Sequence, residues 1–139
     1  MITREASLVK KYNGRWESYQ ILENIAPKST LIKTYTPPLT FVFIPIYFVT
    51  GDQTYYWLQL DLQLDGTYIF KNIKSTSALE HILDIVWQPC YGNMTITITN
   101  TDITSTRTAD ILIYGILIPK DQYDNFIQEI QTPSVRILT

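Results

Sequence analysis

The sequence predicts an all-β fold with one helix near its C-terminal end. Isoleucine, threonine and tyrosine recur throughout the 139 residues, and these residue types favour strands. Turn-forming residues separate about eight strand-like runs at intervals of roughly ten residues, a pattern typical of a β-sandwich or barrel. Since eight strands in two sheets is the jelly-roll count, we expect a single jelly-roll β-sandwich of about eight antiparallel strands with a short C-terminal helix.

The chain divides into three segments. Residues 1–15 read as an irregular N-terminal arm, because Asn13-Gly14 interrupts its short apolar stripe. This arm is either a partly ordered tail or a segment that docks on a neighbouring copy. Residues 16–119 carry the strand-like runs of the sandwich. Residues 120–139 hold a helix over Lys120–Ile130, where apolar residues recur at helical spacing, and a short tail.

The first strands are expected over Trp16–Ile25 and Thr30–Thr36, joined by a turn at residues 26–29. A third run, Thr40–Thr50, is strongly β-prone but contains Pro45. Because proline has no backbone N–H to donate, Pro45 predicts either an edge strand or a β-bulge.

The middle of the chain carries a hairpin signal. Thr54–Leu64 alternates leucines with polar residues, which predicts a half-buried strand. Asp65-Gly66 then predicts a tight turn that returns along Thr67–Ile73. The next segment, Ser75–Trp87, fits both helical and strand spacing. We favour one helical turn near Ser77 followed by a strand, because the surrounding segments are all strands.

The last two strands have different requirements. Gly92–Asn100 alternates apolar residues with threonine, so its threonine face can stay in water. Ala109–Ile118 is apolar on both faces, so one face belongs in the core and the other needs a cover. Either the Lys120–Ile130 helix folds back on it or a neighbouring subunit packs there, and Gly115 permits a close approach. The residues expected at a subunit interface are Leu112, Tyr114, Ile116, Ile118, Tyr123 and Phe126.

Charge patterning narrows the classes of partner. The net charge is −2, which argues against a general nucleic-acid binder because such proteins need a basic face. Only 17% of the residues are charged. No lysine or arginine occurs between Lys33 and Lys71, or between Lys74 and Arg107. Such stretches are typical of a sheet that is packed on both sides or that meets another subunit.

No catalytic, cofactor or metal motif is apparent, and we expect a protein that is not an enzyme. The single histidine, His81, and the single cysteine, Cys90, lie in apolar or aromatic surroundings and are interpreted as packing residues. Asp52, Asp61 and Asp65 lack the spacing of a calcium loop and are interpreted as turn residues, although calcium bound by distant loops stays open. The apolar runs are too short for a membrane-spanning helix.

A glycan-binding platform is the best specific-site hypothesis. Tyr55, Tyr56 and Trp57 cluster beside a polar face that carries Gln59 and Asp61. An exposed ring can stack on the apolar face of a sugar, while amide and carboxylate groups bind its hydroxyls. The alternative is that these aromatic residues cover the sheet or fill an interface.

Three stretches carry a resemblance to a known class of proteins. "LQLDGTYIF", "GNMTITITNTD" and "ADILIYGILIP" resemble the C-terminal half of small single jelly-roll domains in virus particles. The style rich in isoleucine, threonine and tyrosine is similar to structural proteins of viruses that infect thermophilic archaea. The resemblance implies a virion location and a role in a capsid, vertex, turret or appendage. It implies no catalytic residues. Together with the doubly apolar strand and the cation-free stretches, it leads us to expect self-association and contacts with other virion proteins. The alternative, from the aromatic cluster, is a module that binds a host-surface glycan or receptor.

Overall fold

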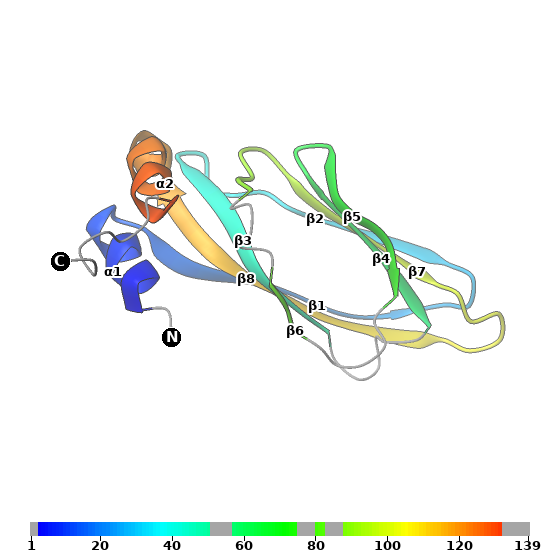
Figure 1. Ribbon diagram of the computed structural model, residues 1–139. Helices are drawn as coiled ribbons and strands as arrows, with labels where there is room; N and C mark the ends of the chain where they lie inside the picture. Colours follow the sequence, from blue (N-terminus) through cyan, green and yellow to red (C-terminus); the bar gives the residue numbers. More distant parts are fainter. Residues whose placement is uncertain (1–2, 51–56, 75–79, 83–87, 132–139) are drawn as a thin grey trace.

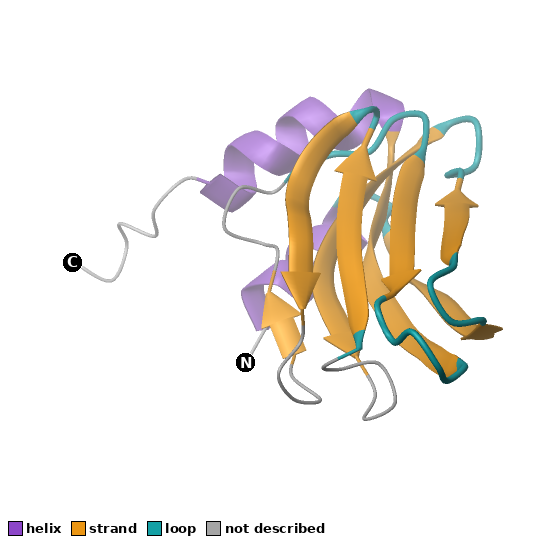
Figure 2. Ribbon diagram, turned by 90° about the vertical axis from the view of Figure 1, so that its right-hand side faces the viewer, coloured by secondary structure: helices purple, strands orange, loops and turns teal. Residues whose placement is uncertain are grey.

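The computed structural model describes residues 3–50, 57–74, 80–82 and 88–131. They form two layers of strands with two helices gathered at one end, and a view turned by 90° places the helices behind the strands (Figures 1 and 2). The elements are α1 (Thr3–Lys11), β1 (Arg15–Ile25), β2 (Thr30–Tyr35), β3 (Phe41–Thr50), β4 (Leu58–Leu64), β5 (Thr67–Lys74), β6 (Glu80–Ile82), β7 (Met94–Asn100), β8 (Arg107–Pro119), the 3-10 turn η1 (Lys120–Gln122) and α2 (Tyr123–Gln131). Neither described helix is long and apolar enough to cross a membrane.

The strand order confirms the predicted jelly roll. The first sheet has the order β1-β8-β3-β6 and the second has the order β2-β7-β4-β5. The first strand in the sequence pairs with the last, the second with the second to last, and so on: β1 with β8, β2 with β7, β3 with β6 and β4 with β5. All four pairs are antiparallel. The chain is therefore one long hairpin of paired strands that is wrapped into two sheets.

The main core fills the space between the two sheets. The predicted alternation along β4 and β7 is confirmed, since every second residue of each strand is buried. Phe43 and Phe48 contribute the largest buried side chains from the first sheet. The predicted turn at Asp65-Gly66 is also confirmed, because both residues have positive φ, 51° and 84°, as a two-residue hairpin turn requires.

Pro45 lies at a β-bulge, which is one of the two positions that the sequence predicted for it. Strand β3 is not an edge strand, because it lies between β8 and β6. The register of β3 on β8 shifts between Pro45 and Tyr47, so the strand carries one extra residue. Pro45 pairs with Gly115 of β8, where the two backbones approach closely.

The expectation of an irregular N-terminal arm is wrong for Thr3–Lys11, which is helical. Asn13-Gly14 ends this helix rather than interrupting a stripe: Asn13 has a φ of 62°, and the Gly14 N–H donates to the Val9 carbonyl at 2.7 Å. Leu8 and Val9 are buried against the rest of the chain, and this burial stabilises a helix too short to form alone.

The starts of β8 and of the C-terminal helix differ in detail from those expected from the sequence. Strand β8 covers Arg107–Pro119, so it begins before the expected start at Ala109. The predicted C-terminal helix is confirmed, although it opens with the 3-10 turn η1 before α2. Within the ambiguous segment, Glu80–Ile82 forms a strand, while the predicted helical turn near Ser77 lies outside the described residues.

We expect Gly115→Ala to destabilise the protein strongly. A Cβ at this position would lie 2.9 Å from both the carbonyl carbon of Ile44 and a ring carbon of Phe43, and closer still to the Ile44 oxygen. Since Ile44 contributes backbone in a central strand, β3 would have to move away from β8. The expected loss of unfolding free energy in urea is about 1–3 kcal/mol. Thr34→Ala, at an exposed position of β2, is the control and should stay within about 0.5 kcal/mol. Wild-type stability of Gly115→Ala would contradict this account.

Candidate functional site

A second core lies on the outer face of the first sheet. It joins outward residues of β3 and β8 to the two helices. Its buried members are Leu8, Val9, Val42, Ile44, Ile46, Ile116, Ile118, Phe126 and Ile130. Both helices cover one end of β8 (Figure 1). Of the two covers that the sequence left open for the second face of this strand, the folded-back helix is therefore the one observed, and α1 joins it.

The two helices are tied together through Glu129 of α2. Its carboxylate pairs with the Lys11 ammonium at 2.9 Å and accepts a hydrogen bond from the Tyr12 hydroxyl. The hydrogen bond to Glu129 is the main cause that raises the pKa of both Lys11 and Tyr12. The Tyr12 ring also meets Phe126 edge to face, with centroids 6.1 Å apart. The helices thus form one cover.

The helix cover ends partway along β8. Beyond it, Leu112 and Tyr114 are only half-buried, and Leu22 of β1 is 62% exposed. Tyr114 stacks on Trp16 at a centroid distance of 5.4 Å and meets Tyr47 at 6.4 Å, so a row of rings crosses three strands. We call this surface the open face. Its outward residues are Ser18, Gln20, Leu22, Tyr47, Val49, Asp110, Leu112 and Tyr114.

The structure separates the six residues of the predicted subunit interface. Ile116, Ile118 and Phe126 are fully buried in the second core of the same chain, so their apolar surface needs no neighbouring subunit. Tyr123 is half-buried and meets the Tyr91 ring edge to face at 5.8 Å, and burial raises its pKa to about 12. Only Leu112 and Tyr114 lie on the open face. The interface itself stays a prediction.

The predicted glycan platform is partly engaged within the chain. Tyr55 and Tyr56 lie outside the described residues. Trp57 is half-buried just before β4, and the Arg107 guanidinium lies 4.8 Å from its ring centroid.

The polar half of that platform lies on the outer face of the second sheet, as expected. Gln59 donates to the Asn72 side chain at 2.7 Å, and Asp61 accepts the Asn72 backbone N–H at 2.6 Å. Gln59 and Asp61 therefore each have a hydrogen-bond partner in Asn72, and a bound sugar would have to share or replace these bonds.

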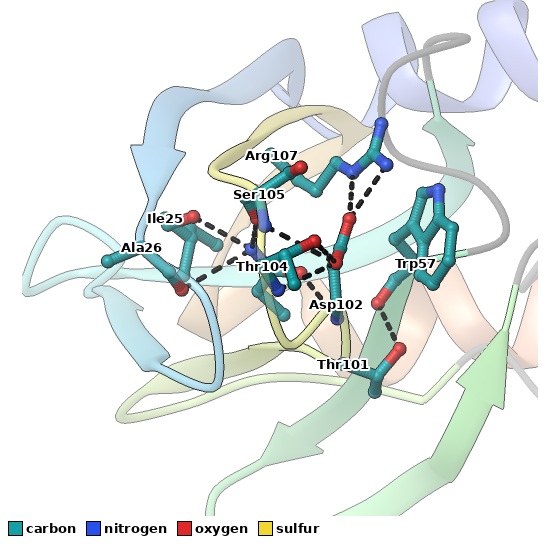
Figure 3. A network of polar contacts seen from close by, with 9 residues as sticks. Ile25, Ala26, Trp57, Thr101, Asp102, Thr104, Ser105 and Arg107 are labelled. Carbon is teal, nitrogen blue, oxygen red and sulfur yellow. Dashed lines mark hydrogen bonds and ion pairs between the residues drawn. The ribbon is translucent and has the colours of Figure 1, made fainter.

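A polar network that the sequence-based reasoning missed ties the loops at one end of the sandwich (Figure 3). The Asp102 carboxylate accepts the Thr104 N–H at 2.9 Å and two bonds from Arg107, at 2.9 Å and 2.7 Å. The Thr104 N–H and then the Arg107 guanidinium lower the pKa of Asp102 from its usual 3.8 to about 2. The Asn100 amide donates to the carbonyls of Ile25, Ala26 and Ser105.

This network fixes the place of Trp57. The Trp57 carbonyl accepts hydrogen bonds from the Thr101 N–H at 2.8 Å and from the Thr101 hydroxyl at 2.6 Å. The Arg107 guanidinium lies over the Trp57 ring and also donates to the Asp102 carboxylate. The signal in the sequence is Asn100-Thr101-Asp102, since Asn and Asp bond nearby backbone in turns.

The residues considered for catalysis or metal binding have packing and turn roles where they are described. The Cys90 thiol is buried in the main core, and burial raises its pKa to about 12, so it stays protonated. His81 belongs to β6, and its side chain lies outside the described part. Burial of the Asp65 carboxylate acts to raise its pKa, but three N–H bonds, from Tyr91, Gly92 and Asn93, lower it overall. Among the described residues, no group of three or more His, Cys, Asp or Glu could hold a metal ion.

Comparison with known proteins gives distant structural neighbours. No protein-family model and no curated protein matches the sequence. Infectious bursal virus-derived T=1 particles contain a chain with 13% identity and a TM-score of 0.42, matched over 79% of this chain and 33% of that one. The VP2 subviral particle of infectious bursal disease virus matches with 15% identity and a TM-score of 0.37, over 79% of this chain and 34% of that one. Dimeric latent PorU from Porphyromonas gingivalis matches with 7% identity and a TM-score of 0.31, over 74% of this chain and 13% of that one. This chain spans about a third of the length of the viral neighbours.

We expect Asp102→Asn to destabilise the protein in a pH-dependent way. Because the folded-state pKa is below the unfolded value, the carboxylate contributes stability above about pH 4, and this contribution is lost as the pH falls through about 2. The melting temperature of Asp102→Asn should therefore lie below that of the wild type at neutral pH, and the gap should close in acid. Circular dichroism melts over this range measure it, with Asp121→Asn on η1 as the control for charge removal. A gap that is independent of pH would contradict the assignment.

Proposed function

We propose that this chain is a non-enzymatic structural protein of a virus particle, which assembles through its β-sandwich and termini into a shell, vertex or appendage. The single observation that carries the proposal is the open face. It supports a structural role because Leu22 of β1, Val49 of β3 and Leu112 of β8 lie outward past the point where the helices stop covering the first sheet.

Burial of this surface would supply the driving force for assembly. Leu22, Leu112 and Val49 present aliphatic side chains, and Tyr47 and Tyr114 present rings beside them. Each square ångström of apolar surface removed from water contributes roughly 25 cal/mol. Tyrosine is also enriched in protein interfaces, where its ring packs and its hydroxyl finds a polar partner.

The rest of the proposal follows the sequence resemblance. A virion location, contacts with other virion proteins and a virus of thermophilic archaea as the source are the expectations it implies. None of the structures named above comes from an archaeal virus, and that source stays a prediction.

The direct test is assembly of the purified chain. We expect oligomers in analytical ultracentrifugation and regular particles or rings in negative-stain electron microscopy, formed in a concentration-dependent way. Leu112→Glu buries a charge in any contact made by the open face and should weaken association by at least about tenfold. Thr95→Glu, outward on the second sheet, is the matched control and should assemble like the wild type. A monomer at all concentrations would overturn the proposal.

A second candidate function is recognition of a host-surface glycan or receptor. It is favoured by the polar outer face of the second sheet, where Gln59 and Asp61 face outward beside Thr97 and Thr99. We expect a glycan-array signal that is lost in Trp57→Ala and weakened in Gln59→Ala. Tyr68→Ala, on the neighbouring strand β5, should bind like the wild type. Equal binding by Trp57→Ala, with its fold verified by circular dichroism, would remove this site.

A further inference from the structure

We infer that Asn93 is a site for an N-linked glycan, which is attached while the chain is still unfolded and which the folded chain then holds in water at one end of the second sheet. This inference does not rest on the proposed function. It concerns a surface other than the open face, and it names a covalent modification of this chain.

The sequence carries one acceptor triplet for such a glycan. Asn93-Met94-Thr95 has the form Asn-X-Ser/Thr, in which X is any residue except proline. Each of the other five asparagines lacks serine or threonine two positions later. Such a triplet also arises by chance in a chain rich in threonine, so its place in the fold decides whether a glycan fits.

The side-chain nitrogen of Asn93 is available in the folded chain. Asn93 is exposed in the bend before β7, and its Oδ1 accepts the Thr36 hydroxyl at 2.8 Å. No described residue accepts a hydrogen bond from its Nδ2. Asn100, at the other end of β7, is the contrast, because it is buried and its nitrogen donates to three carbonyls. A glycan on Asn93 therefore displaces no bond within the described part of the chain.

The backbone of Asn93 is fixed independently of that nitrogen. Its N–H donates to the Asp65 carboxylate at 2.9 Å, and its carbonyl accepts the Asp65 N–H at 2.8 Å. The same carboxylate accepts the N–H groups of Tyr91 and Gly92. The bend can therefore form in the same way with a sugar on Nδ2, which keeps one N–H after substitution.

The rest of the triplet requires that attachment precedes folding. Met94 is fully buried in the main core. Thr95 lies in β7, where it pairs with Thr34 of β2 and with Gln63 of β4. The transferring enzyme must hold Asn93 and Thr95 together in one site, because it recognises both residues of the triplet. On the folded chain this would pull β7 away from both neighbouring strands and Met94 out of the core.

The transfer balances with one co-reactant, an oligosaccharide that is linked to a polyprenol through phosphate or diphosphate. The Asn93 Nδ2 attacks C1 of the first sugar, and the bond from C1 to the phosphate oxygen breaks. The lipid phosphate leaves with both electrons of that bond, and Nδ2 loses one of its two protons to a base. The donor and the base belong to an oligosaccharyltransferase, so the chain must pass into the compartment where that enzyme acts.

The glycan and the open face do not compete for space. Asn93 precedes β7 of the second sheet, whereas Leu112 lies outward on the first sheet. The bend lies near the helices, because the Tyr91 ring meets the ring of Tyr123 in α2. A glycan on Asn93 would therefore cover the end of the second sheet beside α2 and leave the open face free.

The first test is cell-free translation of the full chain, with a cleavable export signal added, in the presence of microsomes. We expect slower migration in a denaturing gel, reversed by peptide-N-glycosidase, which leaves aspartate at the modified position for mass spectrometry to locate. Asn93→Gln and Thr95→Ala should lose the glycan, and Thr95→Ser should keep it. Asn125→Gln, at an exposed asparagine of α2 outside any triplet, should be glycosylated like the wild type.

The second test compares folded and unfolded acceptors. Unglycosylated chain made in bacteria and folded is added to detergent-opened microsomes, beside a synthetic peptide of residues 91–98. We expect transfer to the peptide and none to the folded chain. Equally fast transfer to both would overturn the order of attachment and folding.

The third test asks whether the fold accommodates the glycan. The glycosylated chain, secreted from insect cells, should melt at the same temperature as its enzymatically deglycosylated form. A glycosylated chain that melts several degrees lower would overturn the assignment of open space at Nδ2. Absence of any glycan on the wild type, in microsomes that modify a control glycoprotein, overturns the whole inference. The proposed function is tested separately by assembly, so either can fail alone.

Discussion

The rest of the structure depends on one constraint: the C-terminal end of β8 must be buried on both faces. This 13-residue strand pairs with β1 on one side and β3 on the other, so it is the centre of the first sheet. Its inward residues, such as Ile111 and Ile113, belong to the main core, and its outward residues Ile116 and Ile118 belong to the second core. A sandwich alone satisfies only the first set. The two helices are therefore part of the folded unit and not appendages to it.

Burial on both faces also explains the backbone irregularities near the helix cover. Where the two faces are most tightly packed, Gly115 of β8 lies against the Ile44 carbonyl of β3, at a distance that excludes any side chain. Pro45 lies directly opposite, and the extra residue of the bulge places Ile46 in the second core together with Ile44. The bulge thus lets β3 serve the main core with Phe43 and Phe48 and the second core with its other residues.

Local signals in the sequence predicted the strands, and long-range contacts account for what they missed. The period of two along β4 and β7, the Asp65-Gly66 turn and the odd position of Pro45 need only neighbouring residues to be interpreted. Helix α1 depends on burial of Leu8 and Val9 against residues more than a hundred positions away, so its short stripe looked irregular. The glycan hypothesis placed Gln59 and Asp61 on the correct face, but nothing local shows that Asn72 engages both. The same holds for Trp57 and Arg107, which only the folded loops bring together.

The extent of the open face follows from element lengths that are fixed by the sequence. Each helix has nine residues, which at 1.5 Å per residue gives about 14 Å of helix. Strand β8 has 13 residues, which at about 3.4 Å per residue gives about 44 Å. Two helices of this size cover only part of the outer face, and they lie at the end where the chain leaves β8 at Pro119. The sequence nevertheless stays apolar at Leu112 and Tyr114, beyond their reach. The difference in length between the helices and β8 therefore leaves part of an apolar row uncovered, and the proposed assembly would use that row.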